Sequence, residues 1–257
     1  MMKDRKPRIM QMLDAKGFVN VQELADHFGV TTETIRRDLA SLEKAGLLNK
    51  VHGGAVSTSQ RTGEITYQNR KVLQAQEKTE IARRAATLIN DGDTVIIMSG
   101  TTTLALAEFL AEKKDLQVVT NSLLLAVALT EHPSLTVHML GGSVRKGNFS
   151  LSGALANQTV SLFNASKLIT GVGGLTPEQG LTDHTLDDAL LLRECIKASH
   201  EVICLADHTK FGIIAQYNVC TANKIGKLIT TSLTPAIVCQ HYHSLGVQVE
   251  VVDMVAK

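Results

Sequence analysis

The chain has 257 residues, 44% of them apolar and 20% charged, and its net charge of +1 at pH 7 gives no overall indication of a nucleic-acid partner. It has no apolar run of the roughly 18 residues that a membrane span needs, and its start lacks the apolar segment of a signal peptide. The four cysteines lie far apart without CxxC spacing, so we expect a reduced, cytoplasmic protein without membrane association.

The N-terminal part, residues 1–57, carries three short amphipathic helical patterns. Apolar residues recur at helical spacing in 5–16 and 21–28, and a third pattern begins only three residues later. Glycines follow each pattern and are typical helix ends. A tight turn between the second and third helices is typical of a helix-turn-helix. The stretch LLNKVHGGAV, which comes next, predicts a small hairpin or wing.

Helical phase separates the two adjacent arginines of the third helix. With Ile35, Leu39 and Leu42 facing the core, Arg37 lies on the opposite face and Arg36 on the flank. Taken alone, such a pair is most simply a solvated face. In the third helix of a three-helix unit, however, an arginine can bond guanine, and threonine hydroxyls can bond phosphates or bases. The expected DNA contacts are Thr31, Thr32, Thr34, Arg36 and Arg37, together with Lys50 and His52 in the wing.

The pattern changes beyond residue 76. Small polar residues at 57–63 indicate a linker, which we place at 58–75, before a second domain at 76–257. There, short apolar runs without alternation are separated by helical patterns, which predicts an α/β domain with a parallel sheet buried on both faces. The expected strands are 94–98, 116–120, 135–140, 167–172, 201–206, 227–230 and 247–252, and the expected helices are 78–90, 102–111, 122–131, 186–199 and 234–244.

Three of the predicted strands end in small or hydroxyl-bearing residues. The first ends in a Gly-Thr-Thr-Thr turn before a helix, which presents N–H groups and hydroxyls to an anion. Because the carboxyl ends of parallel strands meet at one edge, the three turns predict one crevice for a phosphorylated, hydroxyl-rich compound. Ordinary turns with Ser or Thr caps are the alternative. The turn residues are Ser99, Gly100, Thr101, Thr102, Thr103, Thr120, Asn121, Ser122, Gly141 and Gly142.

These motifs resemble the DeoR family (DeoR/GlpR-type) of bacterial transcriptional regulators over nearly the whole chain. The resemblance rests on VQELADHFGVTTETIRRDLASLEKAGLL and VHGGAV, and further on KTEIARRAATLINDGDTVIIMSGTTT, MLGGSVRK and LADHTKFG. It implies a winged helix-turn-helix and a sensor domain similar to ribose-5-phosphate isomerases, with Asp183 and Lys210 lining the crevice. For Asp207, which lies in the motif LADHTKFG, the alternative is a purely structural role, in which its side chain caps the turn that follows. Lys50 stands where an arginine is usual in the family. A lysine keeps the phosphate contact but lacks the planar guanidinium group of arginine.

The expected function is a repressor of a carbohydrate-utilisation operon, which binds double-stranded operator DNA as a homodimer or homotetramer. Its effector would be a phosphorylated sugar or sugar alcohol, and no metal or other cofactor is expected. The alternatives are an isomerase-like enzyme with a fused helix-turn-helix and a three-helix module that binds a protein partner. Isomerisation needs a carboxylate base, but residues 171–175 hold no acid, and Asp187 and Asp188 are expected to be solvated or to cap a helix. We therefore expect no enzymatic turnover.

Overall fold

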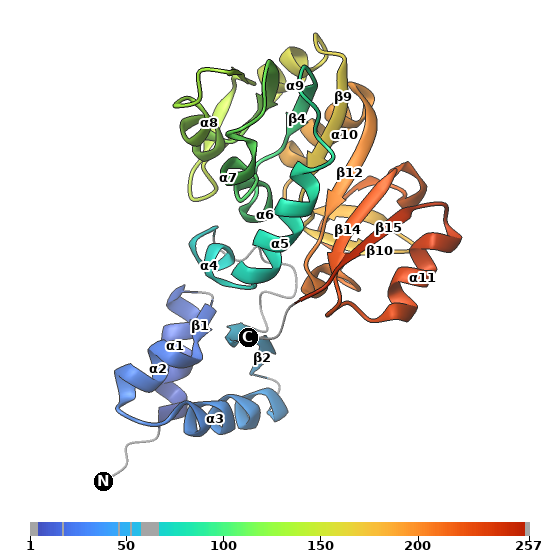
Figure 1. The fold of residues 1–257 in the computed structure, drawn as a ribbon. Coiled ribbons are helices and arrows are strands. Elements are labelled where there is room, and N and C mark those ends of the chain that lie inside the picture. Colours follow the sequence, from blue (N-terminus) through green and yellow to red (C-terminus); the bar gives the residue numbers. More distant parts are fainter. Residues whose placement is uncertain (1–4, 17, 46, 52, 58–66, 255–257) are drawn as a thin grey trace. The chain divides into compact units, whose positions relative to one another are not determined.

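The computed structural model describes residues 5–16, 18–45, 47–51, 53–57 and 67–254 (Figure 1). They form two compact units, Met1–Gln74 and Ala75–Lys257, each with its own hydrophobic core. The boundary falls inside the segment 58–75 that is predicted as a linker, and part of that segment is helix α4 (Tyr67–Val72). None of the helices described is long and apolar enough to cross a membrane.

The N-terminal unit packs three helices against a small antiparallel sheet. All three predicted helices are present, and the predicted wing is the hairpin of β2 and β3. A further strand, β1, which the sequence pattern does not indicate, pairs with β3 and gives the sheet order β1-β3-β2. The elements are α1 (Arg5–Lys16), β1 (Phe18–Asn20), α2 (Val21–Phe28), α3 (Thr32–Lys44), β2 (Leu48–Val51) and β3 (Gly54–Ser57).

Short-range hydrogen bonds set the ends of α2 and α3. The Asn20 side chain accepts hydrogen bonds from two backbone N–H groups in the first turn of α2 and so caps that helix. Gly29 ends α2 in the left-handed conformation (φ +63°), which glycine adopts without steric cost. Thr31 then caps α3, because its Oγ1 accepts from the N–H of Thr34. These caps produce the tight turn of the helix-turn-helix.

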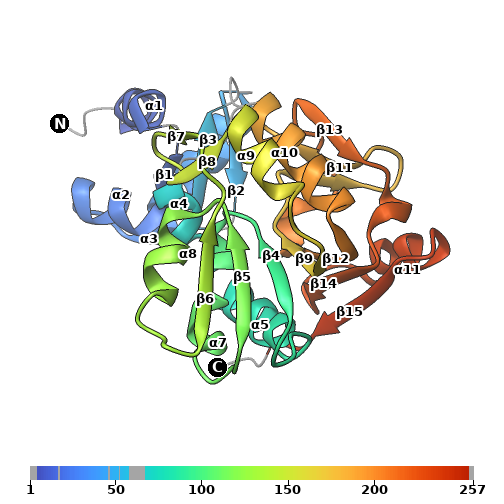
Figure 2. The ribbon, with the colours of Figure 1, turned by 90° about the horizontal axis from the view of Figure 1, so that it is seen from above.

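The C-terminal unit is built on a seven-stranded sheet with the order β15-β14-β12-β9-β4-β5-β6 (Figure 2). Every neighbouring pair in this sheet is parallel, and all seven predicted strands are confirmed, with ends shifted by up to two residues. The strands are β4 (Thr94–Ile97), β5 (Leu116–Thr120), β6 (Leu135–Met139), β9 (Ala165–Thr170), β12 (Ser199–Leu205), β14 (Lys227–Thr231) and β15 (Gln248–Val252).

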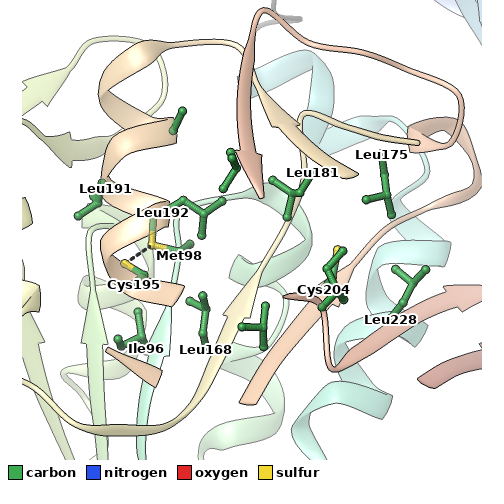
Figure 3. Close-up of a cluster of buried hydrophobic side chains, with 14 of the residues drawn as sticks. Ile96, Met98, Leu168, Leu175, Leu181, Leu191, Leu192, Cys195, Cys204 and Leu228 are labelled. Carbon is green, nitrogen blue, oxygen red and sulfur yellow. Dashed lines mark hydrogen bonds between the residues drawn. The ribbon is translucent and has the colours of Figure 1, made fainter. Parts of the chain in front are cut away.

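Both faces of this sheet are buried, which explains why its strands show no alternation of polar and apolar residues. Successive side chains of a strand point to opposite faces. Val95 and Ile97 of β4 therefore join one apolar cluster, whereas Ile96 and the following Met98 join the other. Figure 3 shows the second cluster, where the Met98 sulfur lies 3.4 Å from Sγ of Cys195.

The helices of the C-terminal unit divide between these two clusters. The four helices between residues 75 and 129 pack in the cluster of Val95, and the three helices between residues 154 and 244 pack in the cluster of Ile96. The prediction of one helix over 102–111 is wrong, because this segment forms two short helices, and the helix predicted at 78–90 is shifted towards the N-terminus. The helices are α5 (Ala75–Ala86), α6 (Thr101–Leu104), α7 (Ala107–Leu110), α8 (Leu123–Leu129), α9 (Ala154–Val160), α10 (Leu186–Lys197) and α11 (Ala236–Ser244).

Several short elements were not predicted, because three or four residues are too few to show a period. β7 and β8 form a hairpin, and β10, β11 and β13 form a separate antiparallel sheet. Two short 3-10 helices, η2 and η3, follow the strands β12 and β13. The elements are β7 (Ser143–Arg145), β8 (Ser150–Ser152), β10 (Gly174–Thr176), β11 (Gly180–Asp183), η2 (His208–Lys210), β13 (Tyr217–Cys220) and η3 (Ala222–Lys224).

The order of the strands creates one point where the chain direction across the sheet reverses. β4, the first strand of the large sheet along the chain, lies inside it, and β5 and β6 extend from β4 towards one edge. β9, β12, β14 and β15 extend towards the other edge. The reversal therefore lies between β4 and β9. In open α/β sheets, the carboxyl ends of the strands at such a reversal border the usual ligand crevice.

A carboxylate on β15 ties two neighbouring elements together. Glu250 binds Arg84 of α5 at 2.6 Å and Lys227 of β14 at 3.0 Å. Partial burial by itself raises the pKa of Glu250, but the hydrogen bonds and charges of Lys227 and Arg84 outweigh it and hold the pKa below its usual value of 4.5. The ionised form is therefore more stable in the folded protein than in the unfolded chain.

We expect this ion-pair network to lose its stabilising effect in acid. A lowered pKa means that the contribution is complete above about pH 4.5, the unfolded value, and is lost as the pH falls through the folded value. Glu250→Gln should therefore lower the melting temperature at pH 7, and the difference from the wild type should shrink on acidification below pH 4.5. Thermal unfolding of both proteins between pH 3 and pH 7 measures this, and a difference independent of pH would contradict it.

Candidate DNA interface and effector crevice

The apolar side of α3 is buried, and its two arginines project from the other sides. Ile35 and Leu39 are fully buried in the core of the N-terminal unit. The side chain of Arg37 is 81% exposed and that of Arg36 is 62% exposed, as the helical phase predicts. Each guanidinium lies 3.7 Å from a carboxylate oxygen of Glu33. Exposed pairs at this distance contribute little free energy, so both arginines can exchange Glu33 for another anion at little cost.

The threonines at the start of α3 differ in how far their hydroxyls are engaged. Oγ1 of Thr31 lies 2.9 Å from Oγ1 of Thr34 and also accepts from the Thr34 N–H, so these two side chains serve the helix cap. Thr31 is exposed, and Thr32 is half-buried. A contact from Thr31 to DNA therefore has to coexist with its capping role.

The wing is attached to α3 through its own backbone. The N–H of Lys50 donates to Oε1 of Glu43 at 2.8 Å, while the Lys50 residue is exposed. His52 lies outside the described residues. Gly54 of β3 pairs with Asn20 of β1, and a Cβ there would lie 2.1 Å from the carbonyl oxygen of Val19. The glycine is therefore required by this close approach of two strands.

An ion pair that sequence reasoning did not find fixes α3 against α1. Nε and Nη2 of Arg5 each lie 3.0 Å from Oδ2 of Asp38, and both side chains are largely buried. Nζ of Lys6 also donates to Oγ of Ser41 at 2.8 Å. These partners are more than thirty residues apart along the chain, so local periodicity cannot reveal them.

In the C-terminal unit, the Ser99–Thr103 turn follows β4 at the reversal of the sheet. Ser99 and Thr101 are half-buried, whereas Thr102 and Thr103 are buried. Oγ1 of Thr103 donates to the carbonyl oxygen of Gly100 at 3.1 Å. The turn leads into α6, which is only one turn long. What this turn can offer to an anion is therefore its N–H groups and hydroxyls rather than a helix dipole.

Asn121 holds this turn in place from the neighbouring strand. Its Oδ1 accepts from the N–H of Ser99 at 2.7 Å, and its Nδ2 donates to the carbonyl oxygen of Leu151 at 3.1 Å. Asn121 is fully buried. The structure thus brings the first two predicted turns together and connects both to β8.

Thr120 and Ser122 use their hydroxyls within the protein. Oγ1 of Thr120 donates to the carbonyl oxygen of Ile97 at 2.7 Å and accepts from the N–H of Ser122. Oγ of Ser122 accepts from the N–H of Leu125 and caps α8. The alternative of an ordinary capped turn therefore describes the geometry at Ser122.

The third turn owes its glycines to close packing. A Cβ on Gly142, whose φ is +108°, would lie 2.4 Å from the carbonyl oxygen of Ser152 in β8. A Cβ on Gly141 would lie 3.0 Å from the side chain of Leu155. These glycines let the β7–β8 hairpin fold back at the end of β6.

Asp183 and Lys210 lie in segments that follow β9 and β12, on the other side of the reversal from β4. Asp183 ends β11, and a Cβ on Gly173, just beyond β9, would lie 3.1 Å from its Cα. Lys210 ends η2, just beyond β12, and its neighbour Phe211 bridges to Leu175 of β10. Since β10 pairs with β11, both residues flank one small sheet at the carboxyl side of β9 and β12.

The other candidate acids are engaged by neighbouring groups. Asp207 is buried and caps η2 through the N–H of Thr209, at 3.0 Å. Asp188 is buried rather than solvated, which corrects one of the two expected roles. Its Oδ2 binds Arg145 and accepts from Oγ1 of Thr185, whose hydroxyl in turn caps α10. Within the described ranges, no group of three or more His, Cys, Asp or Glu side chains is placed to hold a metal ion.

Comparison with known proteins decides the family. Residues 5–61 match the family model of the DeoR-like helix-turn-helix domain, and residues 73–232 match that of the DeoR C terminal sensor domain. The chain belongs to the DeoR family. This confirms the resemblance that the sequence motifs indicate.

Relatives that match this DeoR-family chain over most of their length are transcriptional regulators. The HTH-type transcriptional regulator GolR of Listeria innocua is 32% identical, covering 97% of this chain and 98% of the relative. The HTH-type transcriptional repressor CsqR of Escherichia coli is also 32% identical, covering 90% and 88%. The glycerol-3-phosphate regulon repressor of the same organism is 31% identical, covering 94% and 96%. The chain is therefore a DNA-binding transcriptional regulator and not an enzyme.

Solved structures with a similar fold are more distant from this DeoR-family chain. Ribose 5 phosphate isomerase A from Neisseria gonorrhoeae has a TM-score of 0.39 and 18% identity, covering 54% of this chain and 53% of that chain. Translation initiation factor eIF-2B from Pyrococcus horikoshii has a TM-score of 0.43 and 19% identity, covering 60% and 62%. Likenesses this distant do not bear on function.

We expect Asn121 to be the main support of the Ser99 turn. In Asn121→Ala, the N–H of Ser99 and the carbonyl oxygen of Leu151 lose their partner, and each unsatisfied buried group costs about 1–3 kcal/mol. Thermal unfolding should show a clear drop in melting temperature, with Asn90→Ala, an exposed asparagine, as the control. Equal melting temperatures for the two variants would show that Asn121 does not support the turn.

Proposed function

We propose that this DeoR-family regulator is a cytoplasmic repressor of a carbohydrate-utilisation operon, controlled by a phosphorylated sugar or sugar alcohol. The observation that supports it best is the exposed arginine face of α3, held outward by a buried apolar stripe and by the Arg5–Asp38 pair. The names of two relatives, the glycerol-3-phosphate regulon repressor and the putative aga operon transcriptional repressor, point in the same direction.

The N-terminal part of α3 would enter the major groove of operator DNA. Arg37, which points directly away from the core, is the proposed base contact, because a guanidinium can bond guanine through two parallel donors. Thr31, Thr32 and Thr34 would face the groove together with Arg37, and Arg36 on the flank is the proposed phosphate contact. Lys50 and His52 of the wing would contact the sugar-phosphate backbone.

The effector would bind at the carboxyl edge of the large sheet. Lys210, the N–H groups of residues 100–103 and the hydroxyls of Ser99, Thr101 and Thr102 would hold the phosphate, and the carboxylate of Asp183 would accept hydrogen bonds from hydroxyl groups. Five of the expected residues have internal roles in the turns, so we propose that they shape the crevice. These are Thr120, Asn121, Ser122, Gly141 and Gly142.

Effector binding would control DNA binding because the effector binds two states of the protein with unequal affinity. An effector that binds the DNA-competent and DNA-incompetent states with different affinities shifts the operator affinity by that difference. A helix-turn-helix protein reads two half-sites about one helical turn apart when it is a symmetric dimer. We therefore propose a homodimer or homotetramer as the active form.

The DNA contacts can be separated by two substitutions. Arg37→Ala should weaken operator binding by roughly 1–3 kcal/mol and relax the preference at one base, whereas Arg36→Ala should weaken binding to all sequences alike. Fluorescence anisotropy with the DNA upstream of the gene itself and with single-base variants, at several salt concentrations, measures both. Arg83→Ala, which removes an exposed arginine from α5, is the control. A wild-type protein without preference for that DNA over random DNA would disprove the proposal.

The effector class can be tested by thermal shift with glycerol 3-phosphate, aldose and ketose phosphates and phosphorylated sugar alcohols. At least one compound should raise the melting temperature of the sensor domain. Lys210→Ala should lower the affinity for it about tenfold or more, because a charge-assisted hydrogen bond is lost. Lys197→Ala, an exposed lysine paired with Glu194, should bind normally. No shift with any compound, or equal affinity in Lys210→Ala, would contradict the proposed effector site.

A further inference from the structure

Glu77 is a buried carboxylate at the start of the C-terminal unit. It is the third residue of α5, which begins at Ala75, directly after the boundary between the two units. Its side chain is only 4% exposed. A carboxylate is rarely buried unless hydrogen bonds or an opposite charge compensate for its lost hydration. The partners of Glu77 therefore indicate what it does.

Three polar groups, from the start of η2 and the end of β14, surround this carboxylate. Oε1 of Glu77 lies 2.7 Å from Nδ1 of His208. Oε2 accepts from Oγ1 of Thr231 at 2.7 Å and from the N–H of His208 at 3.3 Å. His208 begins η2 after β12, and Thr231 is the last residue of β14. One side chain on α5 thus holds two strand ends at the carboxyl edge of the sheet.

The 3-10 helix η2 is held from both sides. Asp207 caps it from within its own loop, and Glu77 holds its first residue through both the ring and the backbone of His208. The last residue of η2 is Lys210, which is the proposed phosphate ligand. Binding at Lys210 would therefore act on a segment that is hydrogen-bonded directly to α5.

α5 is a rigid body on the face of the sheet. Its residues Ile81, Ala82 and Ala85 are fully buried, and Arg84 near its other end binds Glu250 of β15. A packed helix moves as a unit, so a displacement at Glu77 is not absorbed within α5. The chain that enters this helix comes from the DNA-binding unit.

We propose that Glu77 is a positioning residue that couples η2 to the start of α5 and thereby to operator affinity. The inference rests on the proposed function, because it assumes that η2 is part of the effector site. Glu77 would not contact the effector or the DNA. It would make the position of the segment between the two units depend on the position of η2.

A purely structural role for Glu77 gives a different expectation. Its loss would then lower the melting temperature but would leave the operator affinity of the folded protein unchanged. Operator affinity, measured well below the melting temperature, therefore separates the two roles. His208 provides an independent way to break the same contact from the side of η2.

The test compares the full-length variants Glu77→Ala, His208→Ala and the double variant with the wild type. The probe is the DNA fragment upstream of the gene itself, at fixed salt and without added effector. We expect both single variants to change the affinity about threefold or more in the same direction. The double variant should change it no more than the larger single effect, because both substitutions remove one contact.

Three further variants serve as controls. Glu80→Ala removes a partly exposed carboxylate one turn along α5, which pairs with Arg83, and should leave the affinity unchanged. Glu77→Gln retains an oxygen acceptor and can donate to a neutral His208 ring, so it should restore most of the wild-type affinity. If Glu77→Ala does not fold, Thr231→Val carries the test, because it removes one donor while preserving the shape.

The outcomes distinguish this inference from the proposed function. Wild-type binding to the fragment, with all variants within twofold of it or with additive effects in the double variant, would overturn the role of Glu77 alone. A wild-type protein that does not prefer the fragment over random DNA would overturn the proposed function and the inference with it. Equal effects of Glu80→Ala and Glu77→Ala would also overturn the role of Glu77.

Discussion

Burial of the large sheet on both faces is the constraint on which the C-terminal unit depends. Apolar side chains of β4 enter two separate clusters, one with α5 to α8 and one with α9 to α11. No unpaired polar group is tolerated between these layers at low cost. Hydrogen-bonding residues therefore gather where the strands end, and the reversal between β4 and β9 makes one such edge the natural place for a ligand.

At that edge, some polar side chains hold the turns in place, while others are partly exposed. Asn121 joins the Ser99 turn to β8, and Thr120 joins two strand ends. Such internal hydrogen bonds hold the turns rigidly, which reduces the entropy lost when a ligand binds. Ser99, Thr101, Asp183 and Lys210 are only partly buried. Glu77 adds a connection from the same edge to the first helix of the unit.

The N-terminal unit also depends on buried contacts that hold a functional element in place. A helix that presents arginines outward must be anchored on its other side. Ile35, Leu39 and Leu42 supply an apolar anchor, and the pair of Arg5 with Asp38 supplies a directional one. The match to DeoR-type helix-turn-helix and sensor domains places these two units in one regulator.

Sequence alone determined the features that depend on near neighbours. Continuous apolar runs identified all seven strands of the large sheet, and helical spacing identified α3 and the outward direction of Arg37, because periodicity reflects local backbone geometry. The short β7 and β8 and the split between α6 and α7 were missed, since three or four residues show no period. The Arg145–Asp188 and Glu77–His208 contacts join residues 43 and 131 positions apart. Only the tertiary fold decides such contacts, because the packing of the sheet determines which distant side chains meet.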